Sequence, residues 1–308
     1  MPTPATTAAR HLVVVVGDVM NDVVVRPQAA VDVATDTPSR IEFSRGGSAA
    51  NQAAWLAALG ASVRFAGRAG AADAAEHALA LERLGVDVRL TVDSAAATGT
   101  VVAFVAADGE RSMFTDRGAN RRLSAADLES LLEGARLLHV SAYQLFEPQS
   151  RPGVLALWEA ATRVGIVTSV DPASFAGVRD AGREAFFEWT TGARLVFPNL
   201  DEGRVLTGSD DPETIVKSLL ERYPVVALKL GPGGALTATA DGGWVQLPAE
   251  AVTVVDSTGA GDAFCAGFLE NFVRDETLER CTAGAVAAAA RVLGQVGARP
   301  QLEEPLQR

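Results

Sequence analysis

Residues 256–264 of this 308-residue chain read DSTGAGDAF, and this stretch decides how the rest is interpreted. It follows an apolar, β-branched run at 251–255 and precedes a segment of helical composition at 263–269. Two glycines at a predicted strand-to-helix junction leave free backbone N–H groups at the helix start, which form an anion site. The carboxylate of Asp262 lies inside that site, where it can act as a base beside a phosphate. The pattern therefore predicts phosphoryl transfer to a hydroxyl group.

Length and charge limit the classes of protein to consider. A chain of 308 residues could form one large α/β domain or two smaller ones. At this size roughly 75% of the unfolded chain's surface is buried on folding, so a large core is available. The formal net charge of −11 argues against a nucleic-acid-binding surface. It does not exclude an anionic substrate, because binding sites are local.

The cysteines, the histidines and the lengths of the apolar segments bear on the cellular compartment and on metal binding. Cys265 and Cys281 both fall in apolar stretches of helical composition, which favours buried free thiols and a reducing compartment. The three histidines show no ligand spacing, so we expect no histidine-based metal site. The apolar run at 12–16 is too short for a signal sequence, and no apolar segment is long enough to span a bilayer. We expect a cytoplasmic protein.

Strand and helix signals alternate along most of the chain. The run LVVVV at 12–16 is typical of a strand buried on both faces of a parallel sheet. Further strands are predicted at 63–66, 137–141, 166–170, 194–197, 225–230 and 244–247, and helices at 49–59, 74–84, 125–132, 154–163, 212–221 and from 263 onward. This alternation predicts an α/β fold, a three-layer αβα sandwich with a mostly parallel central sheet.

Two early segments do not fit that sheet. Residues 22–27 and 39–43 are mixed in polarity, and residues 100–115 read as a hairpin around Asp108-Gly109. We expect them to form a small β-sheet lid, from about 22–45 and about 98–116, over the carboxyl edge of the main sheet. Open α/β folds bind ligands at that edge. The whole chain, 1–308, is interpreted as a single domain with this lid.

Two common nucleotide-binding loops are absent. The chain has only two lysines, Lys217 and Lys229, and neither follows a glycine, so the G-x-x-x-x-G-K-[ST] loop is excluded. The G-x-G-x-x-G fingerprint is also unmet, because Phe264 stands at the third glycine position. A nucleotide would therefore be held by backbone amides, a metal and scattered polar groups.

A second glycine motif and an acid are candidates for substrate binding. Residues 46–51 read GGSAAN and open a helix, so that a ligand could approach the backbone at Gly46 and Gly47, with Asn51 facing the helix start. An ordinary glycine turn with a solvated Asn51 is an equal alternative. Asp22 follows the first strand and could accept two vicinal hydroxyl groups, or it could be a solvated loop acid.

Two later segments are candidates for the nucleotide and its metal. Asn199 and Glu202 are three residues apart after a predicted strand, where they could hold a hydrated Mg²⁺. They could also form a helix capping box, and the two interpretations are compatible. The loop KLGPGG at 229–234 could lie against a base or a phosphate, or could be a plain hairpin turn.

Taken together, these segments resemble the ribokinase-like (PfkB) carbohydrate kinase family, in the family's order, from about residue 11 to residue 300. The motif at 256–264 is highly specific for that family, and GGSAANQA at 46–53 is moderately specific. The resemblance implies a ribokinase-like fold. It also implies an ATP-dependent sugar kinase that uses Mg²⁺ and transfers the γ-phosphoryl group to a primary hydroxyl.

The resemblance assigns roles to individual residues. The catalytic set would be the base Asp262 and the anion-hole backbone of Gly259, Ala260 and Gly261. The sugar would be held by Asp22, Gly46, Gly47 and Asn51, with Glu147 as a looser match. Arg117 lies near the predicted sugar pocket, where it could bind an acidic or phosphorylated sugar, or it could be a solvated loop arginine. The nucleotide would contact Asn199, Lys229, Gly231, Gly233 and Gly234. Glu202 would bind Mg²⁺ through water, and Asp256 and Thr258 would lie at a candidate K⁺ site.

Three positions depart from the ribokinase pattern. Ser48 stands where ribokinases usually have Lys, and Met20 where they usually have Asn, which argues against ribose itself as acceptor. Gln301 stands where a Ser often helps to bind the monovalent ion, which weakens the case for K⁺ activation.

Two other functions remain open. A nucleoside kinase of the same family needs a flat apolar slot, which Met20, Phe104 and Phe114 could supply. A non-catalytic sugar-binding regulator is the alternative from another class, and the intact 259–262 core argues against it. The expected partners are a small sugar and ATP, together with a second copy of the chain bound through the lid.

Overall fold

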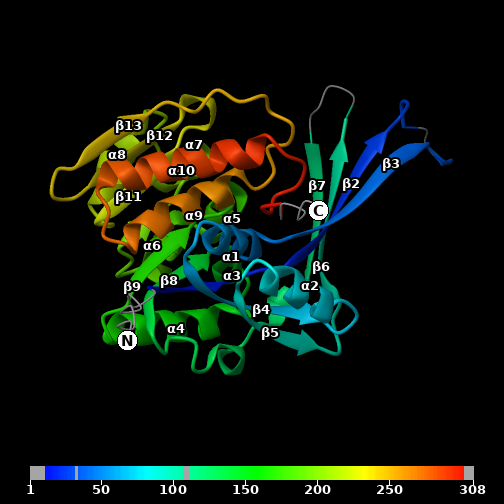
Figure 1. Ribbon diagram of the computed structural model, residues 1–308, viewed down its shortest axis with the longest axis horizontal. Coiled ribbons are helices and arrows are strands. Elements are labelled where there is room, and N and C mark those ends of the chain that lie inside the picture. Colours follow the sequence, from blue (N-terminus) through cyan, green and yellow to red (C-terminus); the bar gives the residue numbers. More distant parts are fainter. Residues whose placement is uncertain (1–10, 32–33, 107–110, 302–308) are drawn as a thin grey trace, which may run out of the picture.

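The computed structural model describes residues 11–31, 34–106 and 111–301, and a nine-stranded sheet forms its centre (Figure 1). The strand order is β13-β12-β11-β10-β9-β8-β1-β4-β5. All neighbours from β11 to β5 are parallel, and β12 and β13 are antiparallel. The strands are β1 (Leu12–Val16), β4 (Ser62–Gly70), β5 (Asp87–Asp93), β8 (Ala135–Ser141), β9 (Val167–Asp171), β10 (Leu195–Val196), β11 (Val225–Lys229), β12 (Ala235–Thr239) and β13 (Trp244–Leu247).

Helices cover both faces of this sheet, as predicted. One face is covered by α1 (Ser48–Ala58), α2 (Ala74–Glu82), α9 (Ala260–Phe272) and α10 (Leu278–Leu293). The other is covered by α4 (Arg151–Arg163), α5 (Phe175–Ala181), α6 (Arg183–Trp189), α7 (Leu200–Thr207) and α8 (Pro212–Leu220). In β1, Val13 and Val15 join the first core and Val14 and Val16 the second. This alternation explains why β1 is apolar at every position.

A separate four-stranded sheet stands beside the main body (Figure 1). Its order is β3-β2-β6-β7, from β2 (Met20–Pro27), β3 (Ser39–Gly46), β6 (Thr98–Val105) and β7 (Arg111–Gly118). The small sheet predicted from the mixed strands is therefore confirmed. The predicted turn at Asp108-Gly109 lies outside the described residues. We call this sheet the lid.

Two local predictions were wrong. The helix predicted at 125–132 is a 3₁₀ turn, η2 (Ala125–Leu128), followed by turns in which Ser130 adopts a φ of 59°. The run at 251–255 forms no strand, and Val254 and Val255 are 60% and 54% exposed. The Val255 N–H donates to the carbonyl of Leu293, the last residue of α10, rather than to a strand. An apolar β-branched run becomes a strand only where a sheet edge is available to pair with it.

Candidate active site

The glycine-rich motif forms the first turn of α9, as predicted, although it follows a loop rather than a strand. Gly259 is the N-cap residue with a φ of 81°, in the left-handed region. A Cβ on Gly259 would lie 2.6 Å from the Ala298 Cβ, so both the conformation and the space require glycine. The first N–H groups of a helix have no intrahelical acceptor, and Asp262 lies in this first turn.

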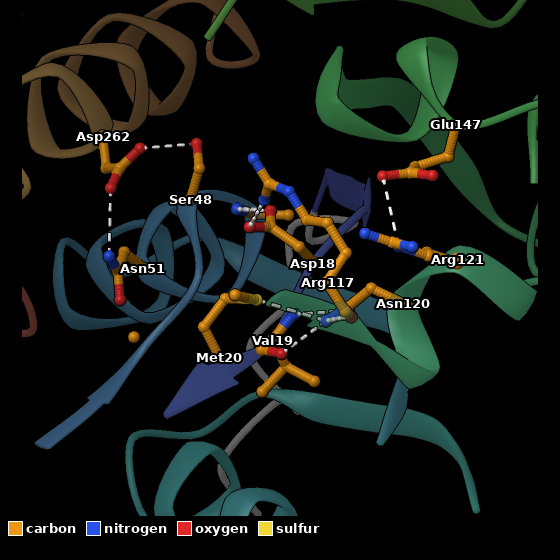
Figure 2. Close-up of polar contacts among 12 residues, drawn as sticks. Asp18, Val19, Met20, Ser48, Asn51, Arg117, Asn120, Arg121, Glu147 and Asp262 are labelled. Atoms are coloured by element: carbon orange, nitrogen blue, oxygen red, sulfur yellow. Dashed lines mark hydrogen bonds and ion pairs between the residues drawn. The ribbon is translucent and has the colours of Figure 1, made fainter. Parts of the chain in front are cut away.

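The Asp262 carboxylate is held by three side chains of α1, and Figure 2 shows two of them, Ser48 and Asn51. Ser48 Oγ donates to Asp262 Oδ1 at 2.7 Å, and Asn51 Nδ2 donates to Oδ2 at 3.0 Å. Gln52 Nε2 lies 3.3 Å from Oδ1. The structure therefore brings together two motifs about 210 residues apart, since Asp262 and Asn51 are 211 positions apart in the sequence. The contacts of Ser48 and Gln52 were not predicted.

The surroundings of Asp262 shift its protonation toward neutral pH. Burial raises its pKa from 3.8 to about 7, against the lowering effect of the hydrogen bonds from Asn51 and Ser48. The negative charges of Asp171 and Asp18 add to the rise. A carboxyl group with this pKa can exchange a proton near neutral pH, which is where a general base is most effective.

A pocket of about 210 Å³ lies between the lid and the helix starts. Its polar floor includes Asp262, Gly47, Ser48, Asp256 and Thr258. The pocket face of the lid contributes Met20, Asp22, Val24, Arg26, Val101, Ala103, Val105, Met113, Thr115 and Arg117. The main-sheet side adds Asp18 and Tyr143. Seven of the site residues predicted from sequence therefore line one pocket, namely Met20, Asp22, Gly47, Arg117, Asp256, Thr258 and Asp262.

Asp22 lies in β2, at the start of the lid, against Gly46. A Cβ on Gly46 would meet Asp22 Oδ2 at 2.0 Å, so this glycine makes room for the carboxylate. Burial raises the pKa of Asp22 to about 6, although Arg299 counteracts the shift. Arg299 also donates to the Gly46 carbonyl at 2.9 Å and to Asn51 Oδ1 at 3.2 Å. Arg299 thus joins the predicted glycine motif to the chain's last described segment.

Arg117 and Glu147 have different surroundings. Arg117 Nη1 lies 3.3 Å from Asp18 Oδ2, and its guanidinium stacks 3.7 Å from the centre of the Tyr143 ring. Glu147 follows α3 (Tyr143–Phe146), and its Oε1 lies 3.9 Å from Arg121 Nε. Figure 2 shows that this pair is separate from the cluster around Asp262. Among the described residues, Glu147 is not part of the pocket lining.

Lys229, at the end of β11, reaches the start of α9. Its Nζ forms an ion pair with Asp171 Oδ1 at 2.9 Å and would lie 3.6 Å from a Cβ on Gly261. Burial is the largest single influence and acts to lower the Lys229 pKa, but the negative charges of Asp171, Cys265 and Glu202 together outweigh it, so the net shift is upward. A positive charge therefore sits beside the helix start, where sequence reasoning expected backbone amides alone. Asp171 was missed, although it directly follows a predicted strand.

The pair Asn199 and Glu202 forms a capping box at the start of α7. Asn199 Oδ1 accepts from the Glu202 N–H at 2.8 Å, and the Asn199 N–H donates to Glu202 Oε2 at 2.8 Å. Burial raises the pKa of Glu202, which is 2% exposed. The capping alternative is confirmed. Within the described ranges, no three His, Cys, Asp or Glu side chains gather as a metal-binding group.

Two further predicted segments are loops with defined geometry. In the loop after β11, Gly231 and Gly234 have φ values of 57° and 87°, and Gly231 and Gly233 are exposed. Asp256 Oδ1 accepts from both the N–H and the Oγ1 of Thr258, at 2.9 and 2.7 Å. The second oxygen of Asp256 accepts from the Gly297 N–H at 3.3 Å.

A parallel αβα sandwich with a sheet lid, closing over an aspartate at a glycine-rich helix start, defines a ribokinase-like phosphotransferase. The family model for pfkB family carbohydrate kinases matches residues 10–305. The chain belongs to this family, and it is therefore a phosphotransferase that uses ATP and has an alcohol group as acceptor.

Individual relatives differ in the acceptor that their names give. The chain is 32% identical to the ATP-dependent ribose-1-phosphate kinase of Halopiger xanaduensis, over 83% of the chain and 82% of that protein. It is 33% identical to a fructokinase of Klebsiella pneumoniae, over 78% and 81%.

Solved structures share the fold over nearly the whole chain. A probable sugar kinase of Rhizobium etli has a TM-score of 0.86 at 26% identity, over 95% of this chain and 96% of that one. An adenosine kinase of Sinorhizobium meliloti has the same fold, with a TM-score of 0.86 at 24% identity, over 96% of this chain and 97% of that one.

In the described part of this chain, no helix is both long enough and apolar enough to cross a bilayer.

Proposed function

We propose that this protein transfers the γ-phosphoryl group of ATP to a hydroxyl of a carbohydrate, with Asp262 as the general base. The observation that carries the proposal is the position of Asp262. It lies in the first turn of α9, lines the pocket under the lid, and has a pKa raised to about 7 by burial. The acceptor hydroxyl would donate to Asp262 and attack in line while the carboxylate takes its proton.

The acceptor would occupy the pocket floor. Asp22 would accept hydrogen bonds from its hydroxyl groups, in the position that Gly46 leaves open for this carboxylate. Gly47 would line the floor beneath the sugar, and Asn51 aligns Asp262. The pocket arginines are already engaged, since Arg26 lies 2.5 Å from Glu42 and Arg117 lies 3.3 Å from Asp18. These ion pairs favour an uncharged acceptor, because an anionic one would have to compete with both carboxylates.

The phosphoryl group and nucleotide would lie on the other side of Asp262. The backbone of Gly259, Ala260 and Gly261 would bind the transferring group, and Lys229 would add a positive charge beside it. The nucleotide would then extend over Asn199 and the exposed glycine loop at 231–234.

The oxygen ligands that the described residues offer fit a Mg²⁺ ion that is bound mainly by the phosphates of the nucleotide. Mg²⁺ usually keeps several waters and binds one or two carboxylates together with substrate phosphates, and the described residues offer no multi-carboxylate cage. We assign Glu202 as the residue that contacts Mg²⁺ through a water molecule. When bound, the ion would neutralise charge on the phosphates.

Asp256 and Thr258 form the candidate K⁺ site. Equal reaction rates in K⁺ and Na⁺ buffers would contradict the assignment of this K⁺ site.

A specific observation keeps the nucleoside kinase as a second candidate. Part of the pocket face of the lid is apolar, through Val24, Val101, Ala103 and Met113, beside the polar Arg26, Thr115 and Arg117 on the same face. An apolar wall opposite a polar floor suits a sugar that carries a flat base. The residues differ from those predicted. Met20 lines the pocket, but Phe114 pairs with Val102 on the opposite face of the lid and is 65% exposed.

The opposite face of the lid supports the predicted homodimer. It presents Val23, Val25, Ile41, Phe43, Val102, Phe104 and Phe114, as shown by the strand register. Phe43 is 80% exposed and Ile41 is 52% exposed. We propose that a second copy of the chain covers this outer face of the lid.

The free, buried Cys265 and Cys281 support a reducing compartment, so we propose the cytoplasm as the location of the protein.

An acceptor panel tests the function. Sugars, sugar acids, sugar phosphates and nucleosides would be incubated with ATP and Mg²⁺, and the products identified by mass spectrometry. We expect phosphorylation of a neutral sugar. Preferential phosphorylation of nucleosides would support the second candidate. ATP turnover without any phosphorylated acceptor across the panel would favour the non-catalytic regulator.

A further inference from the structure

Gln52 links the two acidic side chains at the floor of the site. Its Nε2 lies 3.0 Å from Asp171 Oδ2 and 3.3 Å from Asp262 Oδ1. An ionised carboxylate only accepts hydrogen bonds, so Gln52 must turn its NH₂ group toward this pair. Its amide oxygen therefore points the other way, into the protein, where Gln52 is fully buried.

That oxygen accepts a hydrogen bond from His139. His139 lies on β8, is fully buried, and its Nε2 is 3.0 Å from Gln52 Oε1. Its Nδ1 is 2.8 Å from Ser169 Oγ on β9, and its ring packs edge-to-face against Phe197 at a centroid distance of 5.8 Å. Burial lowers the pKa of His139 to about 4, so the ring is neutral at pH 7 and carries a single N–H.

These contacts allow one consistent set of protons. Gln52 Oε1 is an acceptor, so the His139 proton must be on Nε2. Nδ1 then accepts from the Ser169 hydroxyl at 2.8 Å, so the single Ser169 proton points at the ring rather than at the Leu138 carbonyl, which is 3.4 Å away. The neutral ring thereby fixes the orientation of the Gln52 amide from behind.

We propose that His139 is a positioning residue for phosphoryl transfer, which locks the Gln52 amide so that its NH₂ group faces Asp262 and Asp171. The proposal rests on the proposed role of Asp262 as base. Without the His139 N–H, the Gln52 amide can rotate and place its oxygen against two carboxylates. Asp262 then loses a donor that stabilises its ionised form and aligns it with the acceptor hydroxyl.

The charge environment of Asp262 predicts the direction of the effect. The charged or titratable groups that face it are Asp171, Asp18, Arg299, Tyr143 and Cys265, with Lys229 beside Gly261. Gln52 is the neutral donor between the two carboxylates, so losing it raises the pKa of Asp262 further. The acid limb of the pH–rate profile should then move to higher pH.

The first variant is His139→Phe, which keeps a ring against Phe197 but removes the donor. Losing a hydrogen bond to a charged group corresponds to a fall in kcat of about 10- to 100-fold. We expect that fall, a KM for ATP that changes little, and a higher midpoint of the acid limb. The matched control is His77→Phe, a second fully buried histidine, whose ring bonds to Asn21 at 2.9 Å. The control should lose stability but keep the pH–rate profile.

A double-mutant cycle with Gln52→Met decides whether His139 acts through Gln52. In the Gln52→Met background, His139→Phe should cause no further loss of kcat. An equal loss in both backgrounds, or an unchanged pH–rate profile in His139→Phe, would overturn the proposal. If His139→Phe does not fold, Ser169→Ala replaces it, with a smaller shift in the same direction expected and an unchanged profile as the refuting result. The Asp262→Asn variant is measured alongside. If its turnover collapses while the His139 variants behave like the wild type, this proposal fails and the proposed function stands. If its turnover does not collapse, the proposed function itself fails.

Discussion

The raised pKa of Asp262 predicts how the reaction rate depends on pH. If Asp262 must be ionised to accept the proton, kcat/KM follows its ionised fraction in the free enzyme. With a pKa of about 7, caused mainly by burial, the carboxyl is about one tenth ionised at pH 6 and about nine tenths ionised at pH 8. We therefore expect kcat/KM to rise about tenfold between these two pH values.

The assay is a coupled ADP-release measurement at constant ionic strength, with the acceptor found by the panel. Asp22 also titrates in this region, because burial raises its pKa to about 6. The Asp22→Asn variant separates the two groups. Its kcat/KM should be lower throughout but should still rise around pH 7. A rise centred near pH 4, as for an ordinary exposed aspartate, would refute the assignment of Asp262 as the titrating base.

Three substitutions test the parts of the site. Gly46→Ala places a Cβ 2.0 Å from the Asp22 carboxylate and should raise the acceptor KM about tenfold or more, with a smaller effect on kcat. Lys229→Met should lower kcat by about 10²–10³ and destabilise the fold by about 3–5 kcal/mol in chemical denaturation, because it leaves Asp171 buried without its cation. Phe43→Ser should shift the protein from dimer to monomer in sedimentation analysis, because it removes the most exposed aromatic of the outer lid face.

Each substitution has a control in the same chain. Gly294→Ala meets only ordinary contacts, with its nearest atom at 3.7 Å, so it should leave the acceptor KM unchanged. Adding Asp171→Asn to Lys229→Met should restore stability but not turnover, and recovery of turnover would contradict the role of Lys229. Phe175→Ser removes an aromatic that is 47% exposed on α5, and it should leave the dimer intact. A Phe43→Ser protein that remains dimeric would contradict the proposed interface.

The sequence predicted the fold where local patterns and tertiary environment agree. The run at 12–16 is apolar at every position because β1 is buried on both faces. The run at 251–255 has similar composition, yet it forms a loop, because pairing depends on a free sheet edge that composition does not encode. The lid strands were found because mixed polarity marks a sheet with one face on a polar pocket.

The site was predicted less completely than the fold. Motif spacing identified Asp262 and Asn51, which the structure joins by a hydrogen bond. It could not identify Gln52 and His139, because the contacts that link them to the site run across α1, β8 and β9. Lys229 was assigned to the nucleotide loop. Its position beside Gly261 depends on the order of strands in the sheet, which no local pattern reveals.

The central claim, that Asp262 is the base of the reaction, is tested most directly by the turnover of Asp262→Asn. Removal of a positioned general base typically costs about 10²–10⁴ in rate. We predict a fall of that size in kcat, with acceptor affinity by calorimetry close to that of the wild type and an unfolding temperature at pH 8 that is no lower. The last expectation follows because a raised carboxyl pKa destabilises the folded state as the pH rises through it. A correctly folded Asp262→Asn protein with near wild-type turnover would contradict the assignment.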